Sequence, residues 1–266
     1  MELQILPIPA FRDNYIWLLR RGRQAAVVDP GDAAPALACL LENDLTLAAI
    51  LVTHHHADHM GGIEELLRHH ACPVYAPRLD AIPSTSVPLD DGDRVSILGL
   101  ELDVLSVPGH TRGHCAYYGA NVGYAPNEAA LAHPLLFCGD TLFGCGCGRL
   151  FEGTAAQMHT SLSRLAALPP DTLVYCAHEY TQANIRFSLT VEPDNERLRQ
   201  RAHQVDERRA RGLATVPSSL EEELATNPFL RSREPSLQAA ASEHADQAIS
   251  DPVRVFATIR EWKDGY

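Results

Sequence analysis

The chain has 266 residues, of which 45% are hydrophobic and 21% charged, which is typical of a globular protein with one large domain or a domain and an appendage. Its net charge of −12 argues against a nucleic-acid partner and against binding to anionic membranes. The start of the chain lacks the basic and long apolar regions of a signal peptide, and no apolar run approaches the roughly 20 residues of a membrane span. The seven cysteines are scattered without a Cys-x-x-Cys pair, as in reduced proteins. We therefore expect a cytoplasmic protein. A monomer is also expected, although neither composition nor cysteine pattern bears on the oligomeric state.

Short apolar runs dominate the first 180 residues and predict strands separated by a few helices. The expected strands are 3–9, 14–20, 25–30, 47–53, 73–77, 94–98, 100–107, 113–118, 135–140 and 173–180, and the expected helices are 33–43, 63–70 and 154–167. Residues 78–93 are expected to form a polar loop, and the 120–134 loop a surface excursion.

From about residue 181 the strand pattern gives way to helical periodicity. We expect helices at 182–191, 195–212, 220–226 and 252–262. The fold class is therefore predicted as α+β, with a domain over residues 1–180 followed by a smaller helical domain over residues 181–266.

Four histidines and an aspartate follow the buried strand 47–53 within six residues, in Thr-His-His-His-Ala-Asp-His. His54 and His56 are two positions apart, so on an extended backbone their imidazoles leave from the same side and His55 points away. Asp58 and His59 come after a turn and cannot easily share one metal ion with the first pair. Two neighbouring metal ions are the more natural arrangement. The alternative, a polar surface tract or tag fragment, predicts no further ligands downstream.

Further candidate ligands do occur, and each stands where an expected strand ends. His110 follows strand 100–107, Asp140 ends strand 135–140, and His178 lies near the end of strand 173–180. Ligand sites in sheets with parallel strands favour that edge. Several ligand types at corresponding strand ends predict one composite site.

These residues resemble a known signature. Residues 53–59 are similar to the His-x-His-x-Asp-His motif of the metallo-β-lactamase superfamily, and His110, Asp140 and His178 match its later ligands. Within that superfamily the chain resembles the glyoxalase II (hydroxyacylglutathione hydrolase) family over nearly its whole length. The matching stretches are residues 139–143, 146–153, 178–180, 227–229 and 260–264.

The resemblance implies an αββα sandwich with a dinuclear metal site and a helical substrate-binding domain. By likeness, His54, His56 and His110 hold one ion, Asp58, His59 and His178 hold the other, and Asp140 bridges them. Zinc suits imidazole and carboxylate ligands, and iron or manganese is the alternative. Asp58 and Asp140 would be the catalytic carboxylates.

The implied reaction is hydrolysis of a glutathione thioester by a metal-bridged hydroxide. S-D-lactoylglutathione would give glutathione and D-lactate, the second step of methylglyoxal detoxification. By likeness, the residues that bind this small-molecule substrate are Arg149, Phe151, Tyr180, Arg260 and Lys263. The family often has lysine at 149 and tyrosine at 151, so Phe151 puts one hydrogen bond to the substrate in question. Composition alone would place Arg260 and Lys263 on a solvated helix face.

Two rival functions deserve comparison. A persulfide dioxygenase of the same superfamily uses one iron and lacks the extended helical domain that carries Arg260 and Lys263. An RNA phosphodiesterase of the superfamily would want a basic surface, which the net charge of −12 opposes. A non-enzymatic relative without metal is disfavoured because all seven candidate ligands are present. For His114 the sequence leaves open whether it supports a metal ligand or simply lies at the surface or in the core. His69, His70, His133, His159, His203 and His244 are expected at the surface.

Overall fold

A first sheet of six strands occupies the N-terminal part of the molecule, in the order β1-β2-β3-β4-β5-β6. The computed structural model describes residues 3–120 and 133–266. β1 and β2 are an antiparallel hairpin, and β3 to β6 run parallel to one another. The strands are β1 (Leu3–Ala10), β2 (Asn14–Arg21), β3 (Gln24–Val28), β4 (Thr46–Leu51), β5 (Val74–Pro77) and β6 (Val87–Leu89).

A second six-stranded sheet packs against the first and has the order β14-β13-β10-β9-β8-β7. Its strands are β7 (Arg94–Ile97), β8 (Leu100–Ser106), β9 (Cys115–Gly119), β10 (Leu135–Gly139), β13 (Leu173–Cys176) and β14 (Ser218–Ser219). β10 and β13 are parallel, so the chain beyond each strand leaves the sheet at the same edge. That edge receives Asp140 and His178.

Alternation along β2 shows why the sheets form layers. Tyr15, Trp17 and Leu19 join the core between the two sheets. Ile16 and Leu18 point the other way, into a second core beneath helices α1 (Ala33–Glu42) and α3 (Ile63–His69). Because successive side chains on a strand face opposite sides, one apolar strand can serve both cores.

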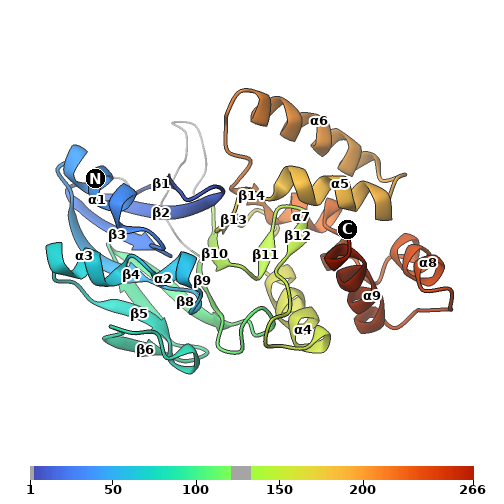
Figure 1. Cartoon of the computed structure of the whole chain (residues 1–266), viewed down its shortest axis with the longest axis horizontal. Helices are drawn as coiled ribbons and strands as arrows, with labels where there is room; N and C mark the ends of the chain where they lie inside the picture. Colours follow the sequence, from blue (N-terminus) through green and yellow to red (C-terminus); the bar gives the residue numbers. More distant parts are fainter. Residues whose placement is uncertain (1–2, 121–132) are drawn as a thin grey trace.

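The C-terminal part is helical and lies beside the sandwich in Figure 1, in orange to red. It contains α5 (Thr181–Val191), α6 (Glu196–Ala210), α7 (Leu220–Thr226), α8 (Pro235–His244) and α9 (Pro252–Asp264), with a short 3₁₀ turn, η2 (Pro228–Leu230). α4 (Ala155–Ala166) joins the two parts through contacts with α9. β14 also belongs to this C-terminal part, yet it pairs with β13. The division at residue 180 stays a prediction.

The expected α+β fold class and αββα sandwich are confirmed, with corrections to individual elements. Residues 57–60 form a short helix, α2 (Ala57–Met60), where the sequence suggested a turn. The supposed loop before Asp93 contains β6, whose Pro88 is tolerated because β6 is an edge strand. The glycine-rich stretch after Asp140 forms a small hairpin, β11 (Leu142–Phe143) with β12 (Gly146–Cys147).

Two more differences concern the helical region and the central loop. α8 was not expected, because its alanine-rich sequence carries only a weak apolar stripe. The predicted surface loop at 120–134 falls mostly on residues 121–132, which lie outside the described residues. Within the described ranges, no helix combines the length and the apolar character needed to cross a membrane.

Candidate metal centre

The histidine-rich loop begins where β4 ends and leads directly into α2. β4 delivers His54 and His56 to the sheet edge, and the first turn of α2 presents Asp58 and His59. The loop packs tightly on Gly31, where an added Cβ would lie 1.8 Å from the carbonyl oxygen of Asp58. Any larger residue at position 31 would therefore displace the loop.

The ring nitrogens of the first trio of candidate ligands lie close together. This trio is His54, His56 and His110. The Nδ1 atom of His56 lies 3.1 Å from Nε2 of His54 and 3.0 Å from Nε2 of His110. His54 and His110 are buried, and His56 is partly buried. Three ring nitrogens that approach one another this closely form a compact nitrogen donor set.

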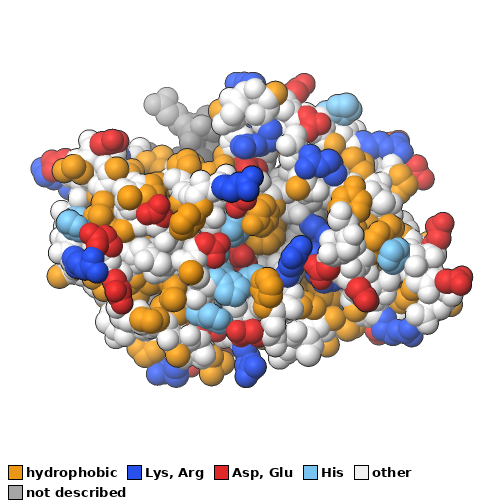
Figure 2. Space-filling view, viewed as in Figure 1, with side chains coloured by type: hydrophobic (Ala, Val, Ile, Leu, Met, Phe, Trp, Pro, Cys, Tyr) orange, Lys and Arg blue, Asp and Glu red, His pale blue; other side chains and the backbone are white. Residues whose placement is uncertain are grey.

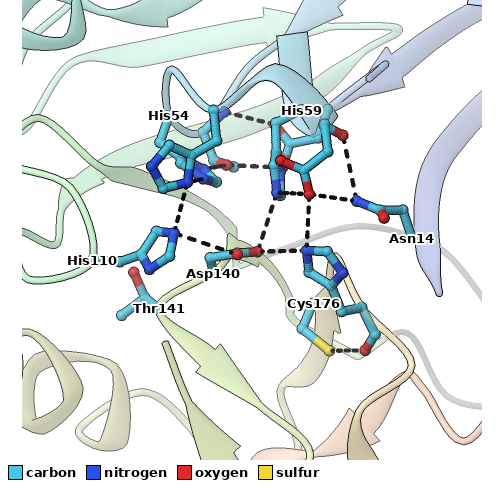
Figure 3. A network of polar contacts seen from close by, with 12 residues as sticks. Asn14, His54, His59, His110, Asp140, Thr141 and Cys176 are labelled. Atoms are coloured by element: carbon cyan, nitrogen blue, oxygen red, sulfur yellow. Dashed lines mark hydrogen bonds and ion pairs between the residues drawn. The ribbon is translucent and has the colours of Figure 1, made fainter. Parts of the chain in front are cut away.

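The second trio, Asp58, His59 and His178, lies beside the first. Oδ2 of Asp58 is 3.6 Å from Nε2 of His59 and 3.5 Å from Nε2 of His178. Asp140 stands between the trios, as Figure 3 shows: its Oδ2 is 3.4 Å from Nε2 of His110, and its Oδ1 is 3.3 Å from Nε2 of both His59 and His178.

These residues fit two metal ions. Among the residues that the structure describes, the buried atoms Nε2 of His59 and Oδ1 of Asp140 have no hydrogen-bond partner, which is costly unless a cation satisfies them. Donor atoms around a tetrahedral zinc ion, with bonds of about 2.0–2.1 Å, lie about 3.4 Å apart. The contacts of Asp140 have that spacing, one oxygen facing each trio. The structure thus brings together all seven ligands predicted from sequence.

Asp29 orients a ligand of each trio. It directly follows β3 and accepts hydrogen bonds from His59 Nδ1 (3.1 Å) and from the Thr53 hydroxyl (2.8 Å). Because the Thr53 hydroxyl donates to Asp29, its oxygen accepts from Nδ1 of His54 at 3.0 Å. Both histidines therefore carry a proton on Nδ1 and turn Nε2 toward the site.

The other ligands are held in the same manner. Nδ1 of His110 donates to the backbone carbonyl of Arg149 at 2.8 Å, and Nδ1 of His178 donates to Asp13 at 3.0 Å. The Asn14 amide donates to Oδ2 of Asp58 at 3.0 Å. Sequence reasoning missed these supporting residues. Asp29 stands at a strand end like Asp140, so the same signal could have found it.

The electrostatics of the two trios differ. Burial lowers the pKa of His54, His56 and His110, so these imidazoles are neutral and their lone pairs are free. Burial also disfavours a charged His59, but Asp140 and Asp29 outweigh it and raise the pKa to about 9. For Asp140, burial is outweighed by His59 and His178, which hold its pKa well below the usual value. The second trio therefore lies in a negative field that attracts cations.

Neighbouring histidines have structural contacts. His55 points away from the cluster, as predicted, toward Asp80 (3.0 Å) and Glu152 (3.3 Å). His114 is fully buried and stacks on His54, with ring centroids 4.6 Å apart. Its Nε2 accepts from the backbone amide of Asp140 at 3.1 Å, so His114 fixes the position of that carboxylate. This resolves the open alternative in favour of a supporting role.

Among the remaining histidines, His69, His70, His203 and His244 lie at or near the surface, as expected. His133 is also partly accessible, with a side chain 31% exposed. His159 differs in part: it is half-buried and lies 3.0 Å from the Ser232 hydroxyl.

A cleft of about 370 Å³ opens beside the metal cluster, between the sandwich and the helical part. Two of the candidate ligands, His110 and Asp140, belong to its lining. Figure 2 shows pale blue histidines near the middle of this face of the molecule, with hydrophobic and charged side chains around them. All five residues predicted to bind the substrate line the same cleft: Arg149, Phe151, Tyr180, Arg260 and Lys263.

The cationic side chains that line the cleft are positioned by contacts with neighbouring residues. Arg260 is only 3% exposed and donates to the carbonyl of Cys147 at 3.0 Å, so it does not belong to a solvated helix face. Lys263 donates to the side-chain oxygen of Asn184. Burial lowers the pKa of Lys263 to about 8, and Arg260 beside it contributes to this shift. Arg149 is exposed and lies 3.5 Å from Asp264.

Aromatic rings complete the walls. Phe151 is 63% exposed, and its ring lies 5.5 Å from that of His56 and 5.2 Å from that of His110. Tyr180 stacks on His178 with centroids 4.6 Å apart. Burial, and then the Asp13 carboxylate, raise the pKa of the Tyr180 hydroxyl, which stays protonated as a hydrogen-bond donor.

Comparisons with known proteins agree with this geometry. Residues 179–266 match the model of the hydroxyacylglutathione hydrolase C-terminus, and residues 10–125 match that of the metallo-beta-lactamase superfamily. A hydroxyacylglutathione hydrolase of Pseudomonas aeruginosa is 52% identical, covering 99% of this chain and 100% of that one. One from Nitrosomonas eutropha is 49% identical and covers 99% of each chain.

Solved structures show the same fold. The crystal structure of ETHE1 from Myxococcus xanthus has a TM-score of 0.67 at 25% identity and covers 98% of this chain and 90% of that chain. The crystal structure of TTHA1623 in a di-iron-bound form has a TM-score of 0.51 at 31% identity. The match covers 65% of this chain and 91% of that chain.

The αββα sandwich, with two donor trios and a shared carboxylate at its edge, defines the class of protein: a dinuclear metallohydrolase. The match over nearly the full length of both chains is more specific. The chain belongs to the hydroxyacylglutathione hydrolase family.

Proposed function

We propose that this protein hydrolyses S-(2-hydroxyacyl)glutathione, with S-D-lactoylglutathione as substrate and glutathione and D-lactate as products. That reaction is the second step of methylglyoxal detoxification. The observation that carries the proposal is a single cleft lined both by the candidate ligands His110 and Asp140 and by the cationic side chains of Arg149, Arg260 and Lys263. Glutathione has two carboxylates, so a cationic wall is needed on this otherwise acidic chain.

The metal ligands are proposed as the sequence predicted them. His54, His56 and His110 would hold one ion, Asp58, His59 and His178 the other, and Asp140 both. Two such ions would lower the pKa of a bound water and polarise the thioester carbonyl. Zinc suits this donor set, and iron, which TTHA1623 holds, or manganese is the alternative.

The chain's own residues would bind and orient the substrate and accept a proton from the attacking water. Arg260, Lys263 and Arg149 bind the carboxylates of the substrate, and the Tyr180 hydroxyl donates to its peptide. Phe151 covers the first trio and shields it from bulk water on that side. Asp58 faces the cluster while its side chain stays 42% exposed, which suits it to receive a proton from the attacking water. Thiolate is a good leaving group, so no strong general acid is required.

A direct assay tests the activity. Purified protein is expected to hydrolyse S-D-lactoylglutathione with about two metal ions bound per chain. The matched control is a lactoyl thioester of N-acetylcysteamine, which lacks the two carboxylates and should be hydrolysed far more slowly. One iron per chain, oxygen uptake on glutathione persulfide and no thioester hydrolysis would instead establish the dioxygenase. A monomeric state and a cytoplasmic location remain expectations from the sequence.

Substrate capture should depend on pH through Lys263. Its amine is charged below its pKa of about 8 and neutral above, so attraction to a substrate carboxylate is present at low pH and lost as pH rises. We expect kcat/KM to fall as pH rises through about 8, because this ratio reports groups of the free enzyme. Lys263→Arg should remove that fall, since arginine stays charged throughout. An identical fall in Lys263→Arg would assign it to another group.

A further inference from the structure

The turn between β1 and β2 reaches across from the first sheet to the metal cluster. The hairpin tip, residues 11–14, is fastened to the segment that carries His178. The backbone amide of Tyr15 donates to the carbonyl of Ala177 at 2.7 Å, and that of Glu179 donates to the carbonyl of Asp13 at 2.8 Å. These bonds hold the tip at a fixed place against the site.

Two side chains of the tip contact ligands directly. The Asn14 amide donates to Oδ2 of Asp58 at 3.0 Å and reaches toward the cluster from β2 in Figure 3. Asp13 Oδ1 accepts from Nδ1 of His178 at 3.0 Å. Asn14 is only 7% exposed, so its amide serves the interior of the site and not the solvent.

The first trio has different supports. His54 donates to Thr53, and His110 donates to the backbone of Arg149. Both partners lie outside the hairpin tip. In the second trio, two of three ligands are held by the tip, and the third, His59, by Asp29. The tip therefore supports one half of the centre.

From these contacts we infer that Asp13 and Asn14 are positioning residues that hold the second trio in its metal-binding geometry. Asp13 fixes the tautomer and ring orientation of His178, and Asn14 fixes which carboxylate oxygen of Asp58 faces the ion. Tyr180 stacks on His178, so the same support extends to the substrate cleft. The inference rests on the proposed ligand assignment.

Zinc titration of the full-length protein tests it. Asp13→Ala and Asn14→Ala are expected to weaken binding of one of the two zinc ions about 10- to 100-fold, the usual effect of losing such a partner, and to leave the other unchanged. Asp13→Asn keeps the shape of the side chain but loses its charge. Its affinity for that zinc ion should lie between those of the wild type and Asp13→Ala. Arg12→Ala is the matched control, because Arg12 is an exposed neighbour in the same turn. The readouts are two dissociation constants from chelator competition and the thermal midpoint of the metal-free protein.

The outcomes separate positioning from a structural role. The inference predicts a selective loss of one ion with an unchanged metal-free midpoint. Wild-type binding of both ions in Asp13→Ala and Asn14→Ala, or equal weakening of both ions, would overturn it. Asp58→Ala, which removes a proposed ligand, isolates the underlying assignment: two tightly bound ions in that variant would refute the ligand set itself. If Asp58→Ala loses tight binding of one zinc ion while Asp13→Ala and Asn14→Ala bind both ions normally, only the role of the hairpin tip is refuted.

Discussion

Asp140→Asn is expected to reduce thioester hydrolysis at least about 100-fold, more than the 10- to 100-fold typical of residues that only support a ligand. Asp140 places one carboxylate oxygen toward each trio and is 7% exposed. Asparagine keeps the shape but replaces one acceptor by an NH₂ donor and removes the charge. Both proposed metal positions therefore lose an anionic oxygen or meet a donor in its place.

Metal content must be measured together with activity in this variant. We expect Asp140→Asn to retain fewer than two ions per chain after dialysis, with a folded far-UV spectrum. The control is Asp194→Asn, because Asp194 has a 99% exposed side chain and no place in the cleft. Full activity in Asp140→Asn with two bound ions would remove Asp140 from the catalytic centre.

Glu223→Gln is expected to destabilise the protein by about 3–5 kcal/mol, the usual cost of breaking a buried ion pair. Glu223 in α7 is fully buried and pairs with Arg201 of α6, whose side chain is 3% exposed. It also accepts hydrogen bonds from the amide of Cys145 and from Ser218, so it ties the β11–β12 hairpin and β14 to the helical part. Without the charge of Glu223, the buried Arg201 guanidinium keeps a hydrogen bond to the Thr226 hydroxyl but has only the more distant, partly exposed Glu222 as a carboxylate partner among the described residues.

Thermal unfolding of the metal-free protein measures this loss. At roughly 2–4 °C per kcal/mol for a chain of this size, the midpoint should fall by about 10 °C. Glu222→Gln is the matched control: Glu222 lies 3.4 Å from the same arginine but is 35% exposed, so its loss should cost at most about 1 kcal/mol. Equal shifts in the two variants would contradict the central role of the buried pair.

The sequence alone predicted most of the architecture, because strong periodic signals do not depend on distant residues. The strands that bury both faces are continuous apolar runs, as in residues 47–53, and α4 begins with the predicted capping box of Thr154 and Gln157. The elements that were missed have weak local signals: β6 is three residues long, and α8 is rich in alanine. Both are stabilised by neighbours that local sequence does not reveal.

The candidate ligands were also accessible from sequence, since His54, His56, His110, Asp140 and His178 all follow apolar strands and match a superfamily motif. Their supports were not. Asp13 directly precedes the expected strand 14–20 and Asn14 begins it, and no local pattern marked either as part of the site. Asn14 contacts Asp58, 44 residues away along the chain, and Asp13 contacts His178, 165 residues away. Hydrogen bonds over such separations depend on how the two sheets pack.

The sequence by itself determined the chemistry available to this protein: four histidines and an aspartate after one strand, and further ligands after three others. The tertiary structure decided which of these side chains are brought together. Sheet packing set one oxygen of Asp140 toward each trio, and the fold of α9 against η2 buried Arg260 beside the same cleft. The physical reason is that residue types and spacings fix which groups can bind a cation. Only distances between remote segments fix which of them meet.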